Sequence, residues 1–171
     1  MAEQELIIKN VKTAECHWDA NLNKQFDPDG THKQSFEFQR STVSSPFSQK
    51  WGELEVYFYT IQPGKANYPY HYHTVNEEVF YIISGQGTLK TSEGEKIVSE
   101  GDVIVMPAHE NGAHKLINTS DAPLVYLEVR TSKSPDIVLY PDIPEKFLVM
   151  SSKIFAKWFN IDSAINYLDG E

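Results

Sequence analysis

The chain has 171 residues with a net charge of −9 and a single cysteine, which indicates one domain without an internal disulfide. The acidic balance and the lack of a Lys/Arg cluster argue against a nucleic-acid partner, because phosphate backbones are bound by basic surfaces. The N-terminal residues do not resemble a secretory signal, and no apolar run has the roughly 18 residues of a membrane span, so we expect a cytoplasmic protein without a membrane partner.

Short apolar segments of strand length dominate the sequence. Residues 6–11 read as a first strand, and residues 12–50 are irregular and polar, with an alternation at Phe36 and Phe38 that fits part of a hairpin. From residue 51 onward, strand-like segments recur about every ten residues and are separated by turn residues. These segments are residues 54–62, 78–83, 86–91, 95–98, 103–106, 114–118 and 124–130. Such spacing predicts an all-β sandwich or barrel, and a double-sheet jelly roll fits the number of strands.

The C-terminal part of the sequence differs from the barrel segments in composition. Residues 135–150 carry three prolines and are predicted to form an extended strap. Residues 162–169 are expected to form one or two helical turns with Asp162 as the cap. No internal repeat or linker divides the chain, so we expect one domain over residues 1–171, with a barrel at about residues 51–131, an N-terminal extension and a short helical tail.

The apolar side chains of the predicted strands indicate the core. The residues interpreted as core are Phe80, Ile82, Val103, Val105, Leu116, Leu124 and Leu127. Tyr57, Tyr59 and Tyr126 are interpreted first as packing side chains, whose hydroxyl groups find hydrogen-bond partners elsewhere. The alternative is that these phenols point into a metal pocket, where they can orient a substrate or donate a proton.

Two histidines and a glutamate form the most informative pattern in the chain. His71 and His73 are separated by one residue, so on an extended backbone both imidazoles point to one face and can reach one ion. Glu78 follows after a gap that allows the chain to turn and bring a carboxylate back to that ion. Imidazole and carboxylate suit first-row divalent metals and can leave coordination positions open. Glu77 competes with Glu78, because both faces of this strand are apolar and alternation alone does not decide.

A second segment strengthens this interpretation. An apolar strand at residues 103–106 leads into a loop that contains Pro107, and His114 then opens another strand. Together the two segments resemble the paired motifs of the cupin superfamily, and the downstream sequence resembles small single-domain cupins. The matching residues are Gly64, His71, His73, Glu78 and Gly85 in the first motif, and Gly101, Pro107, His114 and Asn118 in the second. The loop from Pro107 to His114 is longer than the commonest spacing, and Gly112 is displaced.

The resemblance implies a double-stranded β-helix, which is the jelly-roll barrel of cupins, with one divalent metal ion that stabilises the fold. The implied metal is Fe, Mn, Ni or Zn, and the implied ligands are His71, His73, Glu78 and His114. The family spacing to Gly85 favours Glu78 over Glu77. The family pattern also places a histidine four residues before an asparagine, which favours His114 over His109 in the lengthened loop.

Two classes of function are compatible with such a site. The first is a small metalloenzyme, such as an oxygenase, isomerase or epimerase that acts on a small polar metabolite. The second is a protein that binds a small molecule or a metal without turnover. The fold does not decide between them, because one fold hosts many functions. We also expect a homodimer, because jelly-roll edge strands are open to pairing and two-fold pairing is the commonest oligomeric arrangement.

Overall fold

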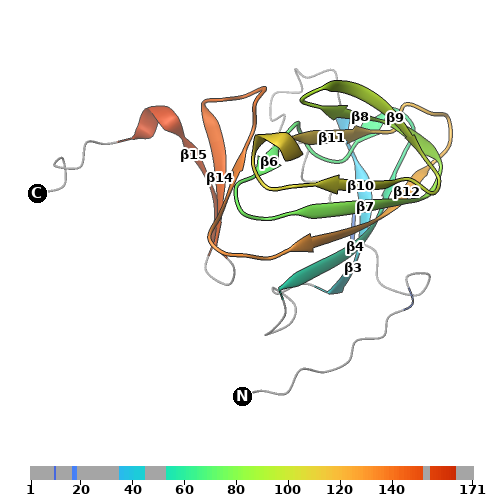
Figure 1. The fold of residues 1–171 in the computed structure, drawn as a ribbon, viewed down its shortest axis with the longest axis horizontal. Helices are drawn as coiled ribbons and strands as arrows, with labels where there is room; N and C mark the ends of the chain where they lie inside the picture. Colours follow the sequence, from blue (N-terminus) through green and yellow to red (C-terminus); the bar gives the residue numbers. More distant parts are fainter. Residues whose placement is uncertain (1–9, 11–16, 19–34, 45–52, 152–154, 165–171) are drawn as a thin grey trace, which may run out of the picture.

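The computed structural model describes residues 10, 17–18, 35–44, 53–151 and 155–164, and these residues are mostly in β-strands (Figure 1). In chain order the elements are β1 (His17–Trp18), β2 (Ser35–Phe36), β3 (Phe38–Ser44), β4 (Leu54–Ile61), β5 (Lys65–Ala66), β6 (Tyr72–His73), β7 (Glu78–Ser84), β8 (Gln86–Thr91), β9 (Gly94–Ser99), β10 (Val103–Met106), the 3₁₀ helix η1 (Glu110–Gly112), β11 (His114–Ile117), β12 (Leu124–Thr131), β13 (Asp136–Leu139), β14 (Lys146–Ser151), β15 (Phe155–Asn160) and the 3₁₀ helix η2 (Ile161–Ser163).

Two mainly antiparallel sheets form a jelly-roll barrel, which confirms the predicted fold class. The larger sheet has six strands in the order β1-β3-β4-β12-β7-β10, and the smaller has five in the order β2-β5-β11-β8-β9. The strands predicted from residue 51 onward are all present, and their ends differ from the predicted ends by one residue at most. The periodic turn signals were therefore sufficient to place the strands of the barrel.

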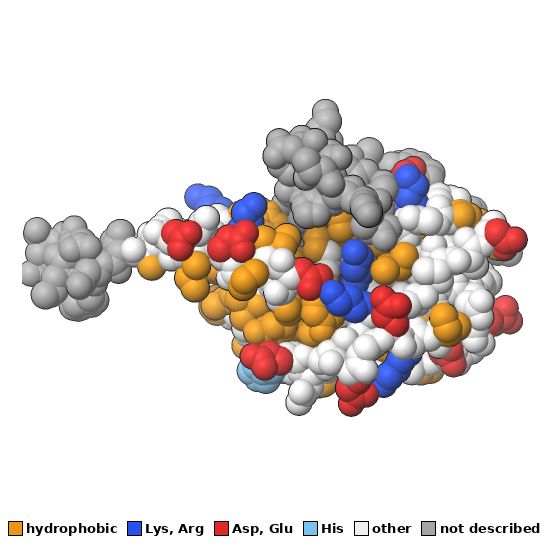
Figure 2. Space-filling view, turned by 90° about the horizontal axis from the view of Figure 1, so that it is seen from above, with side chains coloured by type: hydrophobic (Ala, Val, Ile, Leu, Met, Phe, Trp, Pro, Cys, Tyr) orange, Lys and Arg blue, Asp and Glu red, His pale blue; other side chains and the backbone are white. Residues whose placement is uncertain are grey.

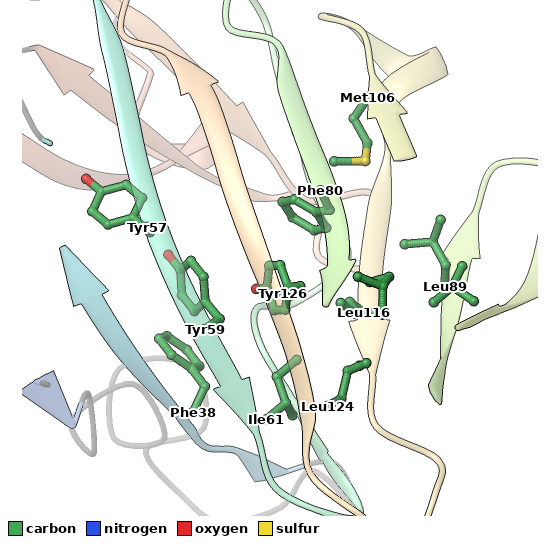
Figure 3. Packing of buried hydrophobic residues seen from close by; sticks show 12 residues of the cluster. Phe38, Tyr57, Tyr59, Ile61, Phe80, Leu89, Met106, Leu116, Leu124 and Tyr126 are labelled. Atoms are coloured by element: carbon green, nitrogen blue, oxygen red, sulfur yellow. The ribbon is translucent and has the colours of Figure 1, made fainter. Parts of the chain in front are cut away.

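The core lies between the two sheets and is rich in aromatic side chains (Figure 3). Tyr59 of β4 and Tyr126 of β12 stack with their ring centroids 4.9 Å apart. The Tyr126 hydroxyl accepts a hydrogen bond of 3.2 Å from Asn67 Nδ2, and the Tyr59 hydroxyl lies 3.4 Å from that of Tyr68. The first interpretation of Tyr57, Tyr59 and Tyr126 is therefore supported, since all three belong to the packed core.

The predicted core residues divide into two groups. Buried inside the barrel are Phe80, Ile82, Leu116 and Leu124. The prediction is wrong for Val103 and Val105, which are 62% and 67% exposed, and Leu127 is only half-buried. These three residues occupy outward positions of β10 and β12. The outer face of these strands is apolar as well, so the polar alternation that usually separates core from surface positions is missing.

The two strands before the barrel correct another prediction. The alternation at Phe36 and Phe38 does not form a hairpin, because β2 pairs with β5 in the smaller sheet and β3 pairs with β4 in the larger one. Glu37 is therefore the point at which the chain crosses from one sheet to the other. The strand predicted at residues 6–11 lies outside the described residues, apart from residue 10.

The C-terminal part forms a sheet of its own instead of an extended strap. Its strand order is β15-β14-β13-β6, so β13 joins the tail to the strand that contains His73. The hairpin of β14 and β15 projects to one side of the barrel (Figure 1). The helix η2 is capped by Asn160, whose side chain accepts a hydrogen bond from the backbone of Asp162, so the predicted cap at Asp162 is wrong. Residues 165–169 lie outside the described part.

Acidic and basic side chains are interspersed on the face seen in Figure 2, and apolar side chains gather toward the side of the C-terminal hairpin. None of the helices within the described ranges is both long enough and apolar enough to cross a membrane.

Candidate metal centre

Three segments from different sheets bring the predicted ligands together. His71 and His73 lie at β6, Glu78 is the first residue of β7 and His114 is the first residue of β11. The backbones of His71 and His114 exchange two hydrogen bonds of 3.1 and 2.9 Å, so these two segments are fixed beside each other. His71 and His73 share one face of the extended chain, as predicted, and both are turned into the barrel, where they are 6% and 5% exposed.

The side chains meet in the barrel interior. One ligand atom from each of His71, His73 and Glu78 lies within 4.8 Å of the other two. Nε2 of His73 is 3.5 Å from one carboxylate oxygen of Glu78, and Nε2 of His114 is 3.2 Å from the other. The ring centroids of His71 and His114 are 4.7 Å apart. His71, His73 and Glu78 therefore form a buried group that could hold a metal ion, with His114 in direct contact with its carboxylate.

Hydrogen bonds fix the outer nitrogens of two imidazoles. Nδ1 of His71 lies 2.8 Å from the carbonyl oxygen of Pro69, and Nδ1 of His114 lies 2.9 Å from that of Gly112. Because a carbonyl oxygen only accepts, these contacts require a proton on each Nδ1. In a neutral ring, Nε2 then presents a lone pair. Both rings are thus held in the tautomer that can ligate a metal through Nε2.

Asp136 of β13 holds the third imidazole. Its Oδ2 atom lies 2.5 Å from Nδ1 of His73 and also accepts a hydrogen bond of 2.9 Å from Asn76 Nδ2. Its Oδ1 atom accepts bonds of 3.2 Å from the backbone nitrogens of Thr74 and Val75. Burial acts to raise the pKa of Asp136, but the bond from His73 and these further donors outweigh burial and lower the pKa. The carboxylate therefore stays ionised and orients the His73 ring.

The imidazoles differ in their affinity for protons. Burial, assisted by the neighbouring His114, lowers the pKa of His71 to about 3, and burial also lowers the pKa of His114. Burial acts in the same direction on His73, but the Glu78 carboxylate and the bond to Asp136 outweigh it and raise the pKa of His73 to about 9. At neutral pH, the cluster without a metal thus holds a proton on His73 and keeps the other two rings neutral.

One carboxylate oxygen shows that a cation fits this cluster. Oε2 of Glu78 is buried, and no group in the described residues donates a hydrogen bond to it, although Nε2 of His114 lies only 3.2 Å away. Since Nδ1 of His114 donates to the Gly112 carbonyl, the neutral ring directs the lone pair of Nε2 toward this oxygen. Two buried acceptors that face each other are unfavourable. A divalent cation bound by both would remove this conflict.

The cluster lines a cavity of about 220 Å³. The C-terminal hairpin supplies one wall of the cavity with Leu148, Met150 and Trp158. The β12 strand supplies Glu128 and Arg130 on the barrel side.

Glu128 is the most unusual ionisable group in the cavity outside the cluster. It is 2% exposed, and burial together with the nearby negative charge of Glu78 raises its pKa to about 8. Arg130 forms an ion pair with Glu55 and lies 3.9 Å from Oε1 of Glu78, directly opposite it in the strand register. The cavity therefore combines two neutral imidazoles, the guanidinium groups of Arg40 and Arg130, and a carboxylic acid that holds its proton near neutral pH.

The two predicted alternatives to these ligands lie elsewhere. Glu77 points outward and is exposed, so the structure brings Glu78 and not Glu77 to the histidines. His109 is exposed at the start of η1, whereas His114 is 2% exposed beside Glu78. Gly112 explains how the lengthened loop stays compact, because a Cβ atom there would lie 1.8 Å from the carbonyl oxygen of Pro107. The choice of His114 as fourth ligand stays a prediction.

Three important residues were not predicted. Glu128 and Arg130 alternate with apolar residues in the sequence of β12, and charged residues at inward positions of such a strand are a detectable signal. Asp136 gives no comparable signal, because it lies in the Pro-containing segment that was interpreted as a strap. Only the pairing of β13 with β6 brings it to His73.

Comparisons with known proteins give a matching family model and solved structures of similar fold. Residues 57–130 match the family model described as Cupin domain. No curated protein sequence matches the chain. A solved structure of a protein provisionally named sugar phosphate isomerase from Acidithiobacillus ferrooxidans is similar, with 26% identity, a TM-score of 0.63, and coverage of 75% of this chain and 80% of that one.

Two further solved structures share the fold at lower identity. A sugar phosphate isomerase of the cupin superfamily from Silicibacter pomeroyi has 20% identity and a TM-score of 0.70, with coverage of 94% of this chain and 96% of that one. The polyketide cyclase RemF from Streptomyces resistomycificus has 13% identity and a TM-score of 0.58, with coverage of 77% and 84%. At such identities these two similarities show the fold alone.

Proposed function

Since residues 57–130 match the Cupin domain model and the chain folds as a jelly-roll barrel, we propose that it is a cupin and a divalent-metal enzyme that moves a proton on a small polar hydroxy-carbonyl compound, as a sugar isomerase does. One observation carries the proposal. The same cavity contains the His/Glu cluster, which is suited to a cation, and Glu128, a carboxylic acid whose pKa is raised. Perturbed acids beside metal clusters are a feature of catalytic sites.

The proposed ligands are His71, His73, Glu78 and His114, with one ion per chain. Imidazole and carboxylate ligands suit first-row ions such as Fe, Mn, Ni and Zn. A bound ion would act as a Lewis acid that polarises the carbonyl group of a substrate. The protein's part is to keep Nε2 of His71 and His114 unprotonated through their Nδ1 hydrogen bonds. His73 must lose its proton to bind, while Asp136 maintains its orientation.

Glu128 is the proposed acid and base. Its raised pKa of about 8 comes from burial first and from the charge of Glu78 second. A metal ion bound to Glu78 would compensate its negative charge and so lower the pKa of Glu128 toward neutrality. Near neutrality a carboxyl group can both accept and donate a proton. In this role Glu128 removes a proton from the hydroxyl-bearing carbon next to the carbonyl group and returns it to the carbonyl carbon, while the hydroxyl proton passes to the former carbonyl oxygen. Proton removal and return leave the enzyme unchanged.

The cavity also indicates the class of substrate. Its volume of about 220 Å³ is below the usual range for drug-sized ligands, which favours a metabolite with a short carbon chain. Arg40 lines the cavity beside Tyr68, and a guanidinium group is well suited to bind an anionic substituent such as phosphate. The similar protein of Acidithiobacillus ferrooxidans carries a name that agrees with a phosphorylated sugar as substrate.

The experiment starts with protein purified without a metal-affinity tag. Elemental analysis should find about one divalent ion per chain, and added metal should raise the melting temperature, because a ligand that binds only the folded state stabilises it. Metal-loaded protein is then incubated in D₂O with short aldoses, ketoses and their phosphates. NMR should detect deuterium entering the carbon next to the carbonyl group of the true substrate.

Glu128→Gln provides the decisive variant, because it keeps the shape of the side chain but cannot accept the proton. This variant should bind the metal as the wild type does and lose the exchange. Glu77→Gln, at an exposed neighbour of the site, should change neither property. A metal-loaded protein that binds a compound of this panel without any exchange would support the alternative, a binding protein without turnover. No metal and no melting shift would contradict the proposed metalloenzyme.

A further inference from the structure

A second cavity lies behind the segment that carries two of the proposed ligands. Tyrosine and histidine alternate over Tyr70, His71, Tyr72 and His73, and on an extended backbone such neighbours point to opposite faces. The two histidines line the cavity of the metal cluster, whereas the two tyrosines line the second cavity. β6 lies where the C-terminal sheet meets the barrel, so side chains from both parts surround this second cavity (Figure 1).

The second cavity has the size and lining of a small-molecule site. Its volume is about 410 Å³, within the range of about 300 to 1,000 Å³ that is usual for such sites. Aromatic and apolar side chains dominate the lining, and Glu110 is the only charged residue among the described residues that line it. We refer to the cavity as the tyrosine pocket and define it by Tyr70, Tyr72, Glu110, Leu139, Pro141 and Pro144.

Hydrogen bonds hold the walls of the tyrosine pocket in place. On one side, the backbone nitrogen of His109 donates a bond of 2.7 Å to the carbonyl oxygen of His73 and so fixes the start of η1 beside β6. On the other side, Nζ of Lys90 donates bonds of 3.0 and 2.8 Å to the carboxylate of Asp142, the residue after Pro141. A pocket that is formed before its ligand arrives loses less entropy on binding.

The charges around the tyrosine pocket favour a cation. Burial first, and the charge of Glu110 second, raise the pKa of Tyr72, so this carboxylate acts on a phenol of the pocket. The ammonium group of Lys90 lies 4.2 Å from the ring centroid of Tyr70, within the range of a cation–π interaction, and Asp142 compensates its charge. Within the lining itself the net charge is therefore negative, as it is for the whole chain at −9.

We propose that the tyrosine pocket binds a small molecule that combines a flat apolar ring with a protonated amine. Tyrosine and proline side chains offer flat surfaces on which a ring packs. The carboxylate of Glu110 and the electron-rich faces of tyrosine rings attract a cation, whereas both repel an anion such as a sugar phosphate. The ligand class therefore differs from that of the proposed substrate, and the site lies outside the metal cavity.

Tyr140 separates the tyrosine pocket from the metal cavity. Among the described residues, it is the one that lines both cavities. Its ring stacks on His71 with the ring centroids 5.9 Å apart, and it packs against Trp158 with the centroids 5.0 Å apart. A ligand in the tyrosine pocket would therefore touch a ring that packs on a proposed metal ligand, yet its binding needs neither the metal nor the proposed activity.

Two-dimensional ¹H–¹⁵N NMR of the full chain tests the proposal, with benzylamine as the probe near neutral pH, where its amine is protonated. Benzylamine should bind with a dissociation constant of about 1 mM, as expected for a ligand of this size, and should shift the amide signals of Tyr72, Glu110 and Leu139. Benzyl alcohol has the same shape without the charge and should bind at least roughly threefold more weakly, and benzoate should bind most weakly. Chelator-treated and zinc-loaded protein should give the same affinity, because the pocket lies outside the metal cavity.

Two variants test the parts of the tyrosine pocket separately. Glu110→Gln removes the charge at an exposed position, so it should weaken the binding of benzylamine about threefold and leave that of benzyl alcohol unchanged. Tyr72→Leu keeps an apolar wall without the ring and should weaken benzylamine binding by a similar factor. Glu100→Gln is the matched control, because Glu100 is also exposed but lies in the turn between β9 and β10, and it should bind benzylamine as the wild type does.

Three results would overturn the proposal. The first is the absence of any shift at about 10 mM benzylamine, which is well above the expected dissociation constant. The second is an affinity for benzylamine that equals that for benzyl alcohol or is unchanged in Glu110→Gln. The third is a set of shifts confined to residues of the metal cavity, such as Glu128 and Val138, because these would place the amine at the cluster.

Discussion

Replacing Asp136 by Asn should weaken metal binding without touching a proposed ligand. In the wild type, Oδ2 of Asp136 accepts hydrogen bonds from two donors, His73 Nδ1 at 2.5 Å and Asn76 Nδ2 at 2.9 Å. An amide has only one oxygen. If the oxygen of the new amide faces Thr74 and Val75, its NH₂ group faces the two donors, His73 Nδ1 and Asn76 Nδ2. The His73 ring must then carry its proton on Nε2 so that Nδ1 can accept a hydrogen bond. The lone pair needed for the metal is lost in that tautomer.

The expected size of the effect follows from the position of Asp136 behind the ligand. Loss of such a supporting group typically costs 10- to 100-fold in metal affinity, which is about 1.4 to 2.7 kcal/mol. The assay is a competition titration of Zn²⁺ or Mn²⁺ between the protein and a chelator, with circular dichroism to confirm folding. Asp142→Asn is the control, since Asp142 is exposed and forms an ion pair with Lys90. An affinity within twofold of the wild type in folded Asp136→Asn would refute the reasoning.

Three further predictions concern the same centre. His114→Ala should weaken metal affinity at least tenfold while His109→Ala changes it little, as measured by the same titration, and the reverse order would show that the longer loop supplies the ligand. The pKa of His73 in the folded state is about 9 and lies above its ordinary value of 6.5, so protonated His73 should stabilise the metal-free protein fully below about pH 6.5, and this stabilisation should be lost as the pH rises through 9. Urea unfolding at a series of pH values should show the decline in the free energy of unfolding. Bound metal should reduce the decline, because the ion replaces the proton on His73. Gly112→Ala would bring a Cβ atom to 1.8 Å from the Pro107 carbonyl, so it should lower both the melting temperature and metal affinity, and a wild-type melting curve would contradict the loop geometry.

Local spacing in the sequence was enough to place the centre of the site. His71 and His73 share a face because of backbone geometry alone, whereas the choice of Glu78 over Glu77 came from the family spacing to Gly85. Both features lie within one short segment. The barrel strands could likewise be predicted, because each is bounded by its own turn residues.

The remaining features depend on contacts between distant segments. Asp136 reaches His73 across 63 positions, and this contact exists only because β13 pairs with β6. The outward orientation of Val103 and Val105 was mispredicted for a different reason. Hydropathy separates inside from outside only when one face of a strand is polar, and here both faces are apolar. Register with β7 settles the orientation, and register is a property of the pair of strands.

The side chains that line the cavity come from two parts of the chain, the barrel and the C-terminal hairpin. The proposed ligands come from the barrel, whereas Leu148, Met150 and Trp158 come from a hairpin that belongs to neither barrel sheet. Substitutions of these three residues would change which molecules fit the cavity and would leave the proposed metal ligands unchanged. Substrate choice in this protein should therefore be open to redesign, or to evolutionary drift, at little cost in metal affinity. Asp136 of the same C-terminal sheet, which holds His73, and Tyr140, which stacks on His71 and packs against Trp158, connect the two properties.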